Sequence, residues 1–205
     1  SFAPQGEIER IFPDEPKEIA RRRQEIRLSV GISKCLFGFK ELNLGLSGDD
    51  YLKQETATYL VLESLFGPGS DLYQSLYDDG LIDENFGFDY SLEKRYGFSV
   101  VGGDTPDPDA LIKRVEEEIP RILDKGISVE VVNRIRKKRL GQMLRAFNSP
   151  EWIANQFTRY RFNHSDLFRL VPVLEDLTPE DVNRRLREHV DLDRMAVSMV
   201  KPLDQ

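Results

Sequence analysis

The sequence predicts an α+β fold, a two-layer sandwich in which a mostly antiparallel sheet is covered by helices. Segments with strand-like alternation occur in pairs near the start and the middle of the chain, with one more at its end. Segments with helical periodicity stand between them in groups rather than one after each strand, which favours α+β over α/β. A length of 205 residues, 40% of them hydrophobic, suits one domain with a sizeable core.

The N-terminal segment is predicted to be a lead-in to this domain. Pro4, Pro13 and Pro16 stand among charged residues, which prevents a long helix. We therefore expect an extended linker over residues 1–20 and a single α+β domain over residues 21–205.

Two extended segments are expected at the start of the domain. In the first, apolar residues alternate with Arg27, Ser29 and Gly31, which predicts a strand with its apolar set on one face. The apolar members are Ile26, Leu28, Val30 and Ile32. The second extended stretch is expected over residues 36–39.

Two helices and a hairpin should follow. Apolar residues at helical spacing predict a helix over about 50–66, which Gly67-Pro68-Gly69 ends, and a shorter helix over 71–77. Alternation over 86–92 and again over 96–100 predicts an antiparallel hairpin.

The remainder is predicted to be mainly helical. Apolar spacing predicts an amphipathic helix over 111–126, and Ser128 should cap the next helix. Ser149 and Thr178, each followed by proline, predict two further helix starts. A last strand is expected over 195–200. Helices on one face of the sheet would then bury every apolar stripe.

Composition excludes several classes of protein. No apolar run approaches the roughly 18 residues of a spanning helix and no signal peptide opens the chain, so we expect a cytoplasmic protein without a membrane partner. Cys35 is the single cysteine, which excludes an intrachain disulfide and a cysteine-based zinc site. With only His164 and His189, most histidine-based catalytic and metal sites are excluded as well.

Two charged features have plain structural interpretations. Residues 134–139 contain five cations, but in a chain of net charge −7 a solvated helix face is favoured and no nucleic-acid partner is expected. Glu188 and His189 match the last two letters of the zinc motif H-x-x-E-H, but Arg185 occupies its first ligand position and cannot bind zinc. His189 then complements a helix dipole and His164 is a loop residue, so no metal site is expected in this chain.

The remaining candidates are also weighed against simpler roles. Gly102 and Gly103 lack the further glycine and the lysine of a phosphate loop, and close backbone approach at a strand end explains them. Asp104, Asp107 and Asp109 lack the pattern of a calcium loop, so helix capping is favoured. The aromatic residues of the hairpin suit either a binding platform or, as favoured, the core. They are Phe86, Phe88, Tyr90, Tyr96 and Phe98.

A family resemblance extends over residues 24–202. It is carried by LFGPGSDLYQSLYDDGL at 65–81, FSVVGGD at 98–104, GFK at 38–40 and NSP at 148–150. The order and spacing of these pieces resemble the C-terminal half of bacterial processing proteases in the pitrilysin and insulinase family of zinc metallopeptidases, which also includes proteins like the mitochondrial processing peptidase.

The resemblance implies a fold and a division of labour. Two homologous α+β halves close like a clamshell around a chamber that holds a peptide, and this chain would be one such metallohydrolase half. Zinc, bound by the H-x-x-E-H motif and a distant glutamate, is expected in the N-terminal half of the same polypeptide. That motif is absent here, so this chain is not expected to be catalytic alone.

The resemblance also points to two substrate-binding positions. The C-terminal half of the family usually supplies an arginine and a tyrosine, separated by six residues, that stabilise the oxyanion. Alignment places Tyr77 at the arginine position and Glu84, or Asp83 with another anchor, at the tyrosine position. A carboxylate there would repel an oxyanion. The parent protein then either needs a homologous subunit that supplies the pair, or is a non-catalytic interaction or assembly subunit.

Overall fold

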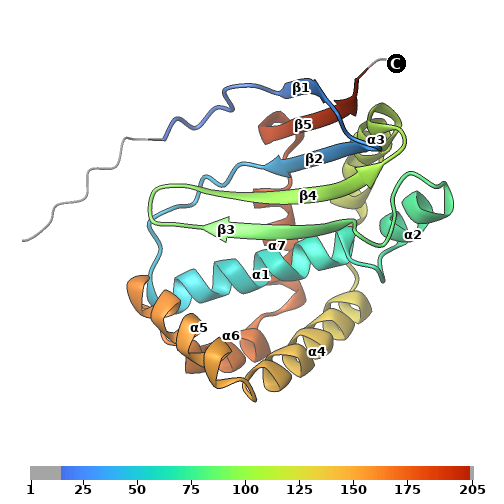
Figure 1. The fold of residues 1–205 in the computed structure, drawn as a ribbon. Helices are drawn as coiled ribbons and strands as arrows, with labels where there is room; N and C mark the ends of the chain where they lie inside the picture. The colour runs from blue at the N-terminus through green and yellow to red at the C-terminus, as the bar shows by residue number, and fades with distance from the viewer. Residues whose placement is uncertain (1–14, 204–205) are drawn as a thin grey trace, which may run out of the picture.

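The computed structural model describes residues 15–203, and five strands among them form one sheet (Figure 1). The strands are β1 Arg23–Leu28, β2 Ser33–Phe39, β3 Gly87–Leu92, β4 Gly97–Thr105 and β5 Met195–Pro202. They are ordered β1-β5-β2-β4-β3. β1 pairs with β5 in parallel and the other neighbours are antiparallel, so the predicted α+β class with a mostly antiparallel sheet is confirmed.

Helices cover one face of this sheet. They are α1 Gly48–Phe66, α2 Asp71–Asp78, α3 Pro108–Lys125, α4 Val129–Ala146, α5 Pro150–Phe162, α6 Leu170–Asp176 and α7 Pro179–His189. In Figure 1 the strands lie in front of α3 and α7. α1 contacts β3, α4, α6 and α7, so it joins the sheet to the outer helices.

The helix starts predicted from capping residues are confirmed. The side chain of Ser128 accepts a hydrogen bond from the backbone N–H of Val131, and Ser149 caps α5 in the same way. Thr178 begins α7 with a full capping box, in which Asp181 bonds back to the Thr178 backbone. The sequence does not predict the short helix α6, because its N-cap residue, Arg169, makes no side-chain cap bond.

The predicted first strand is wrong in its extent. β1 ends at Leu28, and Val30 and Ile32 lie in the connection to β2, where the Val30 N–H donates to the Leu28 carbonyl. The alternating pattern continues beyond the end of β1, because Ser29 and Gly31 occupy the positions that polar residues take in a strand. Ile26 and Leu28 remain exposed, so the expectation that every apolar stripe is buried is also wrong.

Alternation along the central strands separates a core face from an open face. In β2, Cys35, Phe37 and Phe39 are buried in the helix-covered core, whereas Leu36 points to the opposite face and is exposed. β5 buries Met195, Val197 and Met199 in the same core. No helix of the part of the chain that the structure describes covers the other face of the strands.

The two adjacent glycines lie inside β4 rather than after it. Gly102 has φ +147°, and a Cβ there would come within 2.0 Å of the Cys35 carbonyl oxygen on β2. Close backbone approach, as predicted, therefore requires glycine at this position. The predicted helix capping is confirmed for Asp107, which caps α3. It is wrong for Asp104, which lies in β4 and pairs with Lys34, and for Asp109, which pairs with Lys201.

Candidate functional site

A groove with a volume of about 630 Å³ lies on the open face of the sheet. Its floor is formed by side chains and backbone of β2, β4 and β5, and one wall is the lead-in that precedes β1. The floor residues on the open face are Leu36, Gly38, Phe98, Val100, Ala196 and Ser198, and the wall residues are Glu15, Ile19, Ala20 and Arg21. We call this feature the open-face groove.

The floor is hollow because small residues stand between larger ones. A Cβ at Gly38 would lie 1.8 Å from the Ser99 carbonyl oxygen on β4, so the close pairing of β2 and β4 excludes any side chain there. Ala196 on β5 is the register partner of Gly38. The larger side chains of Leu36 and Phe98 flank Gly38 and Ala196, so an apolar depression lies between them.

One end of the groove is bordered by two stacked aromatic rings. Tyr96 and Phe98 have ring centroids 6.3 Å apart with an interplanar angle of 17°, and both are exposed. The favoured interpretation of the aromatic hairpin as core is therefore wrong for these two residues. It is confirmed for Phe86, which is buried, while Phe88 and Tyr90 pack against the core.

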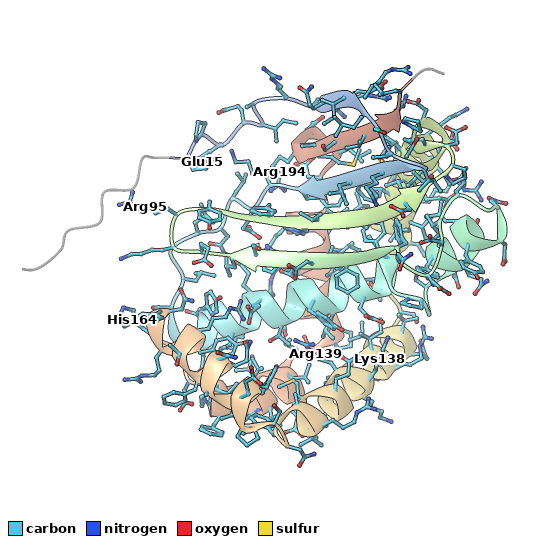
Figure 2. The ribbon with its side chains drawn as sticks, in the orientation of Figure 1. Glu15, Arg95, Lys138, Arg139, His164 and Arg194 are labelled. Atoms are coloured by element: carbon cyan, nitrogen blue, oxygen red, sulfur yellow. The ribbon has the colours of Figure 1, made fainter. Side chains whose placement is uncertain are left out.

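The lead-in is held against the sheet by Lys40, which follows β2. Its Nζ donates to Glu15 Oε1 at 2.6 Å and to the Glu18 carbonyl at 3.0 Å. Arg194 Nη1 donates to the Lys40 carbonyl at 3.0 Å. Figure 2 shows Glu15, Arg194 and Arg95 at this end of the sheet. The wall of the groove is therefore fixed by specific polar contacts.

The two positions predicted from the family resemblance lie elsewhere. Tyr77 is 47% exposed at the end of α2, with its ring stacked on Tyr73 at 6.3 Å. Glu84 is exposed in the loop after α2, and the Tyr73 hydroxyl donates to the Asp83 carbonyl of that loop at 3.5 Å. Burial, followed by the charges of Tyr77, Asp83 and Glu84, raises the pKa of Tyr73.

Tyr77 and the 83–84 loop therefore both lie near Tyr73. The helix α2, which carries Tyr77 and precedes the 83–84 loop, is at the opposite end of the sheet from Arg95 and Glu15 (Figures 1 and 2). The structure thus brings these two positions near each other but does not bring them to the open-face groove.

A buried ionic cluster joins residues that are far apart in the sequence. Arg185 forms an ion pair with Glu41, and both side chains are at most 4% exposed. His189 lies with Nδ1 3.3 Å from Glu41 Oε2 and Nε2 2.9 Å from Ser99 Oγ. The Tyr90 hydroxyl also donates to Glu41 Oε2, at 2.8 Å. The sequence offers one weak signal for this cluster, the i, i+4 spacing of Arg185 and His189 on one helix.

Burial and neighbouring charges set the ionisation of this cluster. Burial raises the pKa of the Glu41 carboxyl, but the hydrogen bond from His189 and the charge of Arg185 outweigh it and hold that pKa well below its usual range. Burial lowers the pKa of His189. His189 lies in the last turn of α7, as predicted, but its ring is buried against Glu41 and Ser99. Its interaction with the helix dipole stays a prediction.

These side chains do not form a zinc site. Within residues 15–203, no three His, Cys, Asp or Glu side chains are grouped so that they could hold a metal ion. Glu41 already accepts bonds from two backbone N–H groups and from Arg185, and the nearby guanidinium opposes a cation. Nor does any helix of residues 15–203 have the length and apolar character needed to cross a membrane.

The basic segment on α4 takes part in internal contacts. Arg134 donates to the Gly69 carbonyl, Arg136 donates to the Leu177 carbonyl, and Lys138 pairs with Glu63. Arg139 lies over the Tyr59 ring at 3.9 Å, and Figure 2 labels it beside Lys138 on α4. Arg134, Lys137 and Lys138 are exposed, as the predicted solvated helix face requires, although several cations of the segment also make these internal contacts. The other histidine, His164, lies in a turn after α5 with φ 53°, as predicted.

The chain resembles known proteins both in sequence and in structure. A family model described as the peptidase M16 inactive domain matches residues 2–139. A relative from Bacillus subtilis, named an uncharacterized zinc protease YmfH, is 43% identical over 201 residues, which are 98% of this chain and 47% of that protein. The chain thus spans about half the length of this curated relative.

Solved structures agree with this relationship. A protein from Alicyclobacillus acidocaldarius, described as an M16-like peptidase, has a TM-score of 0.89 at 35% identity and is matched over 95% of this chain and 47% of its own. An inactive peptidase domain from Bordetella parapertussis shares the fold, with a TM-score of 0.66 at 16% identity over 88% of this chain and 96% of its own.

Proposed function

This chain belongs to the peptidase M16 family and matches the C-terminal, inactive domain of that family. From this membership we propose that the chain is the non-zinc half of a peptidase that encloses a peptide. In this proposal the N-terminal half of the same polypeptide holds zinc and the general base. Zinc bound there supplies a polarised carbonyl and an activated water. The present chain contributes one wall of the chamber and contacts to the peptide.

The observation that carries the proposal is the uncovered sheet face with its groove. Soluble proteins rarely expose a large contiguous apolar face unless it binds something. Leu36, Tyr96 and Phe98 are each at least 40% exposed here. Since the chain spans about half of its curated relative, this face is suited to enclose a chamber with the other half.

Tyr77 and Glu84 are proposed as further peptide contacts. Tyr77 is exposed, and its hydroxyl is a hydrogen-bond donor at the position where the family resemblance expects arginine. The carboxylate of Glu84 is an acceptor only and cannot donate to an oxyanion. A homologous subunit that carries the arginine and the tyrosine is therefore the proposed source of oxyanion stabilisation.

Reconstitution of the two halves tests this function. We expect no cleavage of an internally quenched peptide by this chain alone, and zinc-dependent cleavage when the separately expressed N-terminal half and the homologous subunit are both added. A further arm omits the homologous subunit, and cleavage there should be slower. Zinc-dependent cleavage by the present chain alone would overturn the non-catalytic assignment.

A second candidate function is a non-catalytic interaction or assembly subunit. The observation that favours it is the absence of a cationic side chain at Tyr77 and of a hydroxyl at Glu84. A stable complex of both halves that binds peptide without turnover, even with the homologous subunit present, would select this alternative.

A further inference from the structure

The floor of the open-face groove has the shape and polarity of a site for one kind of side chain. Its floor combines Leu36 and Phe98 with the gap left by Gly38 and Ala196, so it offers apolar contact around a depression. A volume of about 630 Å³ is within the range of sites that hold small ligands or several peptide side chains. The floor therefore suits a large apolar side chain.

The rim of the groove is positively charged. Among its lining residues, Arg21, Lys40 and Arg194 are cations and Glu15 is the single carboxylate. Lys40 is paired with Glu15, and Arg194 with Asp191. Arg21 is exposed and donates to the neutral amide of Gln24 at 2.6 Å. A net positive rim in a chain of net charge −7 is complementary to a carboxylate.

We propose that the open-face groove binds an extended peptide segment in which a large apolar side chain stands next to a carboxylate. The apolar side chain occupies the depression over Gly38, and the carboxylate lies at the rim beside Arg21. The proposal rests on the proposed function, since it assigns the peptide preference of the chamber wall. An extended peptide fits because the groove is bordered by the lead-in on one side and by the Tyr96–Phe98 stack at one end.

Binding of short peptides to the 205-residue chain tests the proposal. The probes are ten-residue peptides of glycine and serine with a central phenylalanine–glutamate, serine–glutamate or phenylalanine–lysine pair, and affinity is measured by calorimetry. We expect the phenylalanine–glutamate peptide to bind about tenfold more tightly than the serine–glutamate peptide. Its advantage over the phenylalanine–lysine peptide should shrink at high salt, because the rim charges are exposed.

Matched variants localise the binding. Leu36 lines the groove, whereas Ile26 lies on the same sheet face outside it, and their exposures are nearly equal at 45% and 44%. Leu36→Ser should weaken binding about tenfold while Ile26→Ser leaves it unchanged. Arg21→Gln should reduce the preference for glutamate over lysine without changing the preference for phenylalanine over serine. Circular dichroism confirms that each variant is folded.

The opposite results would overturn the proposal. They are equal affinity for the three peptides, no binding to the wild-type chain, or equal effects of Leu36→Ser and Ile26→Ser. Self-association that Leu36→Ser abolishes in sedimentation would instead assign the groove to a second copy of the chain.

The two proposals can fail separately. If the reconstituted halves cleave peptides but Leu36→Ser leaves their substrate preference intact, the groove assignment fails and the proposed function stands. If the groove binds peptide with the stated preference but the reconstituted protein shows no turnover, the peptidase function fails and the groove assignment stands.

Discussion

At the scale of single residues, Glu41 shows how one side chain can join distant parts of the fold. Its carboxylate accepts bonds from the backbone of residues 42–43, from Tyr90 on β3 and from Arg185 on α7. Arg185 Nε in turn donates to Thr58 Oγ1 on α1 at 2.7 Å. A buried charge pair need not add net stability, but removal of one partner leaves an uncompensated charge.

Glu41→Gln should therefore be strongly destabilising. We expect the free energy of unfolding to fall by about 3–5 kcal/mol, because Arg185 loses its buried counter-charge and keeps only the half-exposed Glu188 nearby. Urea denaturation measures this loss. Glu188→Gln is the matched control: Glu188 is half-exposed and lies 3.7 Å from the same guanidinium, so its loss should cost less than about 1 kcal/mol. Equal effects of the two substitutions would contradict this account of the cluster.

His189 predicts a dependence of stability on pH. Its pKa is lowered in the folded state from the ordinary 6.5, by burial first and also by the nearby charges of Arg185 and Arg194, against the opposing effect of Glu41. As pH falls below 6.5, the unfolded chain therefore binds a proton that the folded chain does not, and stability is lost. Glu41, lowered from 4.5, adds a second loss at more acidic pH.

Urea midpoints between pH 8 and pH 5 measure this dependence. The wild-type midpoint should fall with pH, and His189→Gln should flatten the fall between pH 7 and pH 5, because glutamine does not titrate. An unchanged slope in His189→Gln would show that other groups cause the loss.

Residue-level partners of this kind could not be predicted from the sequence. Glu41 and Arg185 are 144 positions apart, and no local pattern connects them. The motif argument that Arg185, one helical turn before His189, cannot bind zinc stays a prediction. The buried role of His189 became visible only when β2, β4 and α7 were placed together.

At the scale of elements, local signals predicted most helices and the hairpin. Caps act through nearby backbone N–H groups, so Ser128, Ser149 and Thr178 could be recognised without tertiary information. The C-terminal end of β1 could not be predicted, since the alternating pattern continues from the strand into the connection that follows it. α6 lacks a side-chain cap and depends on its buried residues Leu170, Val173 and Leu174 instead.

Thr178→Ala tests the contribution of a predicted cap. Loss of its side-chain bond to the Asp181 N–H should lower the free energy of unfolding by about 1 kcal/mol. Thermal or urea unfolding measures the change. Thr158→Ala is the control, because Thr158 lies exposed within α5 and its hydroxyl bonds to the Ala154 carbonyl of the same helix. An equally large loss of free energy of unfolding in Thr158→Ala would contradict a specific contribution of the Thr178 cap.

At the scale of the whole molecule, the fold class and the family followed from order and spacing over most of the chain. The open-face groove did not, because it depends on which strand face lacks helices and on how Lys40 holds the lead-in. Tyr96 and Phe98 illustrate the difference: their alternation predicted a strand, but it could not tell which face of the sheet the helices cover. A cytoplasmic location remains a prediction.

The central claim is that this chain works as one half of a longer peptidase. The mass of the native polypeptide in its source cells, detected with an antibody against this chain, tests the claim most directly. We predict a band near twice the 23.7 kDa of the chain, roughly 45–50 kDa for two domains of this size. A band at 23.7 kDa alone would contradict the claim.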